Sequence, residues 1–156
     1  MRVARETIYT GLFAFLKNAP GLVYSSRRFV PFAQLEGKTP ALLQLEKDEG
    51  QTPRPDARMA PAWELGVIVL VFVSVTRDPN FIPYTPLNEI LDYIEATIPP
   101  STPVTATQPY GTGQVRQNLG IPGVQSISIE GTIVKDEVFE AATGCYAAVP
   151  IKIVIA

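Results

Sequence analysis

The residues that could carry chemistry are few, and their types restrict the reactions open to this chain. The sequence contains no histidine. The commonest general base, the imidazole metal ligand and the usual serine or cysteine triads are therefore missing. Cys145 is the only cysteine, and without a histidine partner we expect it to be a small packed residue. We expect no catalytic residue, no cofactor and no metal site, and hence a protein that is not an enzyme.

Two short runs concentrate carboxylates, at residues 46–50 and 135–140. Each lies at the expected end of a strand, where charged side chains are usually solvated, and an acid–base pair or an oxygen-ligand metal site is the less favoured interpretation. The glycine-rich segment 111–120, GTGQVRQNLG, resembles a phosphate-binding loop. It lacks the Gly-Lys-Ser/Thr ending and does not run from a strand into a clear helix, so we expect a flexible loop.

The stretch YSSRRFVPF, residues 24–32, is the most distinctive polar feature. Arg27 and Arg28 are adjacent and lie between serines and the aromatic residues Tyr24 and Phe29. The pair could contact phosphate and stack on bases, could form ion pairs with a neighbouring subunit, or could only keep a strand solvated. Because neighbours in a strand alternate, we expect the two side chains to point to opposite sides.

Composition favours a single globular domain over the whole chain, residues 1–156, with some apolar surface left for contact with other proteins. Hydrophobic residues make up 46% of the sequence and charged residues 18%, and the net charge is −2. A net charge of this size and sign produces no long-range positive field that would attract nucleic acid. The lone cysteine and the start of the sequence favour synthesis in a reducing cytoplasm. The longest apolar run, 67–73, is too short for a membrane helix, so we expect no membrane partner.

Two segments repeat apolar residues at helical spacing. The first is 4–17, with Glu6 in its first turn, where an acidic residue suits the helix dipole. For the second, the sequence predicts Thr85 as N-cap and Pro86 at the first helical position, with Pro99 as the stop. The two predicted stripes are Ile8, Leu12, Phe15 and Leu16, and Leu87, Ile90, Leu91, Ile94 and Ile98.

The remaining periodic segments predict about five strands. The run 64–76 is apolar in both registers, which is typical of a central strand covered on both faces. Pro150 cannot donate a hydrogen bond to a ladder, which favours an edge position at that end of the last strand. Two connections, 49–63 and 99–120, are long and polar or rich in proline, and are expected to be an extended arm and a loop. The predicted strands are 22–29, 40–48, 64–76, 124–137 and 147–156.

Together these segments predict an α+β fold. A mostly antiparallel sheet of about five strands would carry two amphipathic helices packed on one face, joined by long loops. The other face of the sheet would then be half apolar, because the central strand is apolar in both registers while its neighbours carry polar residues there. Such a face suggests burial against another copy of the chain or another protein.

The order and spacing of these segments resemble the small tail terminator, or tail completion, proteins of long-tailed bacteriophages and prophages. The similarity extends over nearly the whole chain. None of its segments is a catalytic motif, so its specificity lies in their order. The segments that carry it are SRR at 26–28, PALLQLE at 40–46, LNEILDYIEA at 87–96, IEGTI at 129–133 and VPIKIVI at 149–155.

The resemblance implies a structural protein of the virion, located at the head-proximal end of the tail. Members of that family form a ring, usually sixfold, that caps the tail tube, stops its polymerisation and presents a surface to the head-completion or neck proteins. DNA passes through the lumen without being held. A slightly acidic protein suits this role, because a strongly basic lumen would retain the DNA. A head–tail joining protein and a small nucleic-acid-binding module are the alternatives.

The ring implies a subunit contact, for which we expect pairing of sheet edges or packing of helix against sheet. We further expect the proline-rich arm at 49–63 to reach the tail tube or the adjacent subunit. The candidate interface residues are Arg27, Arg28, Arg54, Arg58 and Trp63.

Overall fold

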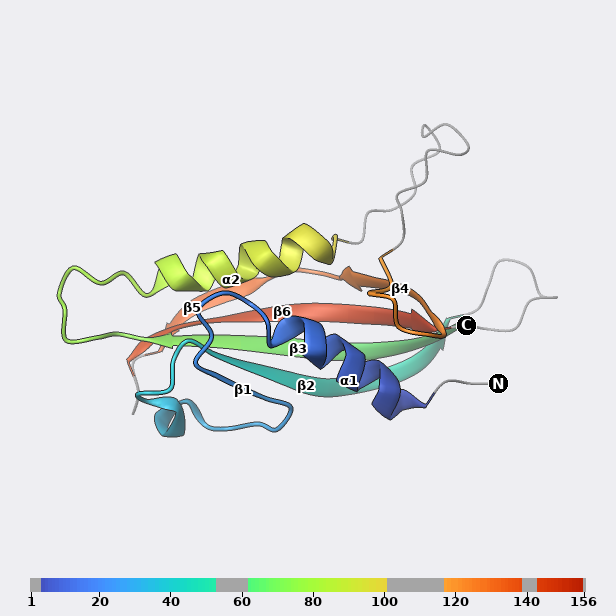
Figure 1. Ribbon diagram of the computed structural model, residues 1–156, viewed down its shortest axis with the longest axis horizontal. Coiled ribbons are helices and arrows are strands. Elements are labelled where there is room, and N and C mark those ends of the chain that lie inside the picture. Colours follow the sequence, from blue (N-terminus) through green and yellow to red (C-terminus); the bar gives the residue numbers. More distant parts are fainter. Residues whose placement is uncertain (1–3, 53–61, 101–116, 139–142, 156) are drawn as a thin grey trace, which may run out of the picture.

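The computed structural model describes residues 4–52, 62–100, 117–138 and 143–155, which form the helices and strands of Figure 1. No helix within these ranges is long and apolar enough to cross a membrane. The elements are α1 (Arg5–Leu16), β1 (Tyr24–Ser26), a 3-10 helix η1 (Phe32–Leu35), β2 (Ala41–Thr52), β3 (Ala62–Ser74), α2 (Tyr84–Thr97), β4 (Val124–Ile129), β5 (Val134–Val138) and β6 (Gly144–Ile155).

The strands form one mixed, mostly antiparallel sheet in the order β1-β2-β3-β6-β4, with β5 also paired to β6. Only the β1–β2 pair is parallel among the named pairs. The predicted α+β class is confirmed, but the described sheet has six strands. The additional strand arises because the predicted segment 124–137 divides into β4 and β5, which pair with opposite ends of β6.

Pro150 explains where that division falls. The peptide N–H of Glu130, between β4 and β5, donates to the carbonyl of Pro150 over 3.0 Å. A strand residue directs its nitrogen and its carbonyl to the same side, so the missing N–H of Pro150 also faces the interruption. The prediction that Pro150 marks an edge strand is therefore wrong. Strand β6 lies between β3 and the β4–β5 pair, and the interruption accommodates the proline.

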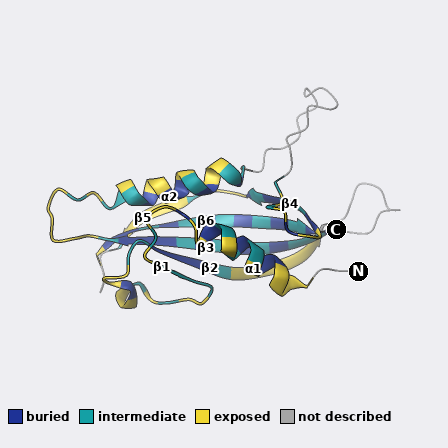
Figure 2. Ribbon diagram, viewed as in Figure 1, coloured by how far each residue is buried: buried dark blue, intermediate teal, exposed yellow. Residues whose placement is uncertain are grey.

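Both helices pack on one face of the sheet, as predicted, and share one hydrophobic core with it (Figure 2). Residues Leu12 of α1, Ile94 of α2 and Val69 of β3 are each fully buried in this core. Helix α2 begins at Tyr84, after Pro83 and without a side-chain cap, so the predicted N-cap at Thr85 is wrong. Thr85 lies inside the first turn, where backbone N–H groups lack helical partners.

The opposite face of the sheet, which we call the open face, is covered at one end only by the segment that contains η1. There the ring of Phe32 stacks on Phe72 with centroids 4.5 Å apart, and Leu35 and Leu43 are buried. Further along this face the strand residues are only half-buried. The predicted half-apolar face is therefore present.

The connection expected at 49–63 is shorter than predicted at both ends. Strand β2 continues to Thr52, and β3 begins at Ala62, so Glu49 and Trp63 are strand residues paired with Leu65 and Gln51. The rest of the expected arm and most of the expected loop at 99–120 lie outside the described residues.

Candidate interaction site

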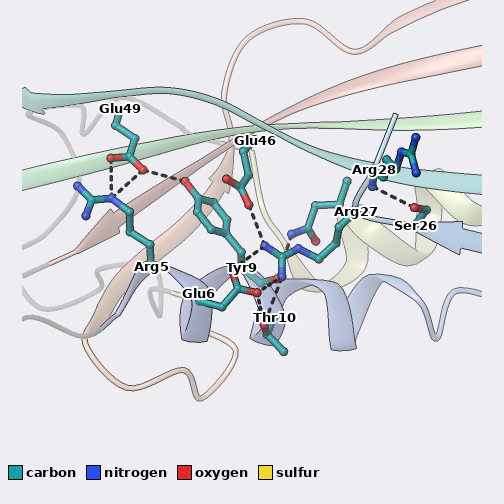
Figure 3. Close-up of polar contacts among 10 residues, drawn as sticks. Arg5, Glu6, Tyr9, Thr10, Ser26, Arg27, Arg28, Glu46 and Glu49 are labelled. Atoms are coloured by element: carbon teal, nitrogen blue, oxygen red, sulfur yellow. Dashed lines mark hydrogen bonds and ion pairs between the residues drawn. The ribbon is translucent and has the colours of Figure 1, made fainter. Parts of the chain in front are cut away.

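The two arginines lie just beyond β1 and not within a strand. The backbone N–H of Arg28 donates to Ser26 Oγ over 3.0 Å. This local hydrogen bond is typical of a serine turn, which directs the backbone away from a ladder. The predicted strand 22–29 is therefore only three residues long, Tyr24–Ser26. The two side chains point in different directions, as expected, but from a turn (Figure 3).

Arg27 links the first helix to the sheet. Its guanidinium forms an ion pair with Glu6 of α1, and its Nη2 lies 2.8 Å from Glu46 Oε1 of β2 (Figure 3). The same group lies 5.8 Å from the centroid of the Tyr9 ring. These contacts are intramolecular, so the charge of Arg27 is already balanced within the chain. Its side chain is only 25% exposed.

A β-bulge brings a second glutamate to the same helix. Residues three apart in a regular strand face opposite sides of the sheet. The register between β2 and β3 shifts between Glu46 and Glu49, so both glutamates face α1. Glu49 Oε2 lies 2.7 Å from Arg5 Nε, and Glu49 Oε1 accepts a hydrogen bond of 3.1 Å from the Tyr9 hydroxyl.

We call Arg5, Glu6, Arg27, Glu46 and Glu49 the arginine–glutamate network. It corrects the expectation that the carboxylates at 46–50 are solvated loop residues, because this run is strand and two of its glutamates are paired. No local sequence pattern indicates these partners. Burial and the nearby Glu49 also raise the pKa of the Tyr9 phenol, which keeps it a hydrogen-bond donor.

The network predicts an acid-dependent loss of stability. The hydrogen bond from Arg27 holds the pKa of Glu6 below its ordinary value of 4.5. The unfolded chain therefore binds this proton at a higher pH than the folded chain. The stability that the ionised Glu6 contributes to the fold is present above pH about 4.5 and is lost as the pH falls through the folded-state pKa of Glu6. We expect the urea midpoint to fall on acidification in this range, and Arg27→Met to weaken that dependence. Equal pH profiles for the two proteins, measured by circular dichroism, would contradict the prediction.

The other predicted interface residues are distributed differently. Arg28 is exposed, and its guanidinium has no ion-pair or hydrogen-bond partner among the described residues (Figure 3). Trp63 is half-buried and packs against the core, with the Arg5 guanidinium 6.0 Å from its ring centroid. Arg54 and Arg58 lie outside the described residues. The structure thus places Arg27, Arg28 and Trp63 in different surroundings and does not gather these three into one patch.

The thiol of Cys145 and the amine of Lys152 are both held in their protonated forms. Burial, and then the charge of Glu137, raises the pKa of the Cys145 thiol to about 11. Hydrogen bonds to Glu64 and then Glu130 raise the pKa of Lys152, whose Nζ lies 2.8 Å and 3.1 Å from these carboxylates. Within the described part of the chain, no group of three or more His, Cys, Asp or Glu side chains is arranged to hold a metal ion.

The open face contains a groove with a volume of about 710 Å³, which has an apolar floor and is also lined by the charged residues Arg27, Glu46 and Lys47. Its floor is formed by half-buried side chains from three neighbouring strands, and the exposed ring of Phe29 stands beside it. The central strand apolar in both registers anticipated a half-apolar face, but the extent of the groove depends on where η1 covers the sheet. The floor residues are Leu45 of β2, Ile68 and Leu70 of β3, and Ala148 of β6.

The chain matches no protein-family model and no curated protein sequence.

Proposed function

We propose that this chain is a structural virion protein that forms a ring on the end of a bacteriophage tail tube. The ring would end polymerisation of the tail tube protein and provide the surface to which the head-completion or neck protein attaches. The order of sequence segments described above supports the proposal.

The observation that carries the proposal is the open face. A sheet face that contains a groove with an apolar floor, opposite the face on which both helices pack, is typical of a surface that contacts another protein. The exposed Phe29 beside the groove adds an aromatic side chain, a residue type enriched at protein interfaces. Ring assembly and tube capping both require such surfaces.

The contacts of Arg27 favour a protein partner over nucleic acid. Because Glu6 and Glu46 balance its charge, Arg28 is the one arginine of the pair that can meet an external phosphate. A single cation is a weak footprint for a nucleic-acid-binding module. Filter binding at two salt concentrations tests this alternative, for which affinity would fall steeply as salt rises.

The proposed function is tested on polymerising tubes. Purified protein is added to the cognate tail tube protein during assembly, and the products are examined by electron microscopy. We expect shorter tubes, each with a ring at one end, whereas tubes assembled without the protein should grow without a defined length. Unchanged tube lengths with no end-bound density would overturn the proposal. Binding to neck complexes but not to tubes would favour the head–tail joining alternative.

A further inference from the structure

The two ends of the open face have different shapes. At the end where β2 begins, the segment that contains η1 lies on the sheet, and Phe32 stacks there on Phe72. At the other end, where β2 pairs with the first residues of β3, the face is hollowed between Gly50 and Gly66. The open face is therefore raised at one end and recessed at the other.

We call the recess the end hollow. It has a volume of about 540 Å³ and adjoins the groove, because Lys47 and Ile68 line both cavities. Gly50 pairs with Glu64, which lies on the same face of β3 as Ile68, so Gly50 also belongs to the open face. A Cβ atom at Gly50 would have no atom within 4 Å, so the space above this residue is empty among the described residues.

Arg28 and Phe29 form an exposed pair beside the raised end. The Phe29 side chain is 57% exposed and stands next to the groove, so it is not held in a cavity of its own chain. The Arg28 guanidinium is exposed and has no described partner. Aromatic and arginine side chains are the residue types that most often anchor an interface, by filling a pocket of the partner. The pair thus has the chemistry of an anchor.

The end hollow has the charge to receive such an anchor. Its lining contains two lysines and four carboxylates, which gives a net charge of 2 − 4 = −2. Asp48 is exposed in this lining and has no ion-pair or hydrogen-bond partner within the described part of the chain. Lys47 is exposed beside it and opposes an incoming cation, so the attraction for Arg28 depends on Asp48. The other charges of the two cavities are paired within the chain: Arg27 with Glu6 and Glu46, Glu49 with Arg5, and Lys152 with Glu64 and Glu130.

A second copy fits this face because the face is complementary to itself when it is turned end for end. A two-fold axis that runs across the strands places the raised end of each copy over the recessed end of the other. An axis along the strands would bring the two raised ends together and hold the sheets beyond the spacing of about 10 Å at which sheet faces pack. Such a contact is isologous, so each copy supplies one anchor and one hollow.

We infer that the free protein forms a two-fold dimer through its open face, with Phe29 of each copy in the end hollow of the other and Arg28 facing Asp48. The inference goes beyond the proposed function, because it concerns the protein before it meets a tail tube. An isologous pair is closed and does not extend into a ring. The dimer must therefore separate before its open face can contact other tail proteins.

Filling the end hollow tests the contact. Gly50→Trp places a large side chain where the second copy would insert Phe29, and Ala96→Trp makes a similar change at an exposed position on α2. Sedimentation velocity over a range of concentrations should show a dimer for the original protein and for Ala96→Trp. We expect Gly50→Trp to weaken the dimer about tenfold or more, with its circular dichroism unchanged. An original protein that stays monomeric, or a Gly50→Trp protein that folds and associates normally, would rule out the dimer.

Charge exchange provides the second test and does not depend on filling the hollow. We expect Arg28→Glu and Asp48→Arg each to weaken the dimer by about tenfold or more, and the double variant to recover most of the loss. Lys47→Glu is the matched control, because it makes the same charge change at another exposed residue of the open face. It should leave the dimer unchanged or strengthen it. Equal weakening at Arg28 and Lys47, or no recovery in the double variant, would overturn the inference.

The two proposals fail in different ways. If Gly50→Trp and Arg28→Glu associate as the original protein does, the dimer is wrong, and tube capping still tests the proposed function. If the dimer responds as described but the protein neither caps nor shortens tubes, the dimer remains and the proposed function is wrong.

Discussion

Gly144→Ala is expected to destabilise the folded sheet strongly. Gly144 begins β6 and pairs with Ser74 at the end of β3. A Cβ atom at this position would lie 2.1 Å from the carbonyl oxygen of Val73 and 2.8 Å from the Cα of Ser74. Both are backbone atoms of a neighbouring strand and cannot rotate away as a side chain can. We expect a loss of about 3 kcal/mol or more, a large part of a typical domain's stability.

Urea unfolding followed by circular dichroism measures this loss, and Gly50→Ala is the matched control. Gly50 is also a strand glycine, in β2, but no atom lies within 4 Å of its would-be Cβ. We expect Gly50→Ala to be neutral or slightly stabilising, because glycine weakens a strand interior. A Gly144→Ala protein with the original urea midpoint would show that β3 and β6 are not packed as described.

Arg27→Glu should destabilise the folded monomer, whereas the same charge reversal at Arg28 should not. At position 27 the change removes the ion pair with Glu46 and the packing on Tyr9, and adds a carboxylate beside those of Glu6 and Glu46. Since exposed pairs contribute little individually, we expect about 1–3 kcal/mol in total.

For Arg28→Glu we expect a free energy of unfolding within about 0.5 kcal/mol of the original, because the side chain is exposed and has no described partner. The two variants therefore separate a stabilising arginine from one available to another molecule. Urea denaturation at neutral pH measures both. Equal losses, or a larger loss at Arg28, would contradict the assignment of Arg27 to the arginine–glutamate network.

The helices were predictable because their signals are local. In α1 and α2 the apolar residues recur every three to four positions, and most of the buried side chains belong to the predicted stripes. In α1 the structure also buries Tyr9, which was not predicted, and leaves Phe15 only partly buried. The alternation in the last strand likewise predicted its buried face, from Val149 to Ile155. The boundaries were less certain, since Ser26 ends β1 early and the bulge lets β2 continue past Glu46.

The candidate site was only partly predictable. The sequence indicated that one of the two arginines is available to a partner, and that the sheet face opposite the helices is half apolar. It could not indicate which arginine, because Glu6 and Glu46 are 21 and 19 residues away from Arg27. Nor could it predict the groove, whose floor comes from β2, β3 and β6.

The amino-acid sequence alone determined the α+β class, the two helix stripes and the absence of histidine chemistry, since these follow from composition and from periodicity within short segments. The tertiary structure decided the interior position of β6, the balanced charge of Arg27 and the exposure of Arg28, whose guanidinium has no partner among the described residues. Each of these depends on which distant segments become neighbours, and that choice is made by packing of the whole sheet and not by any local pattern.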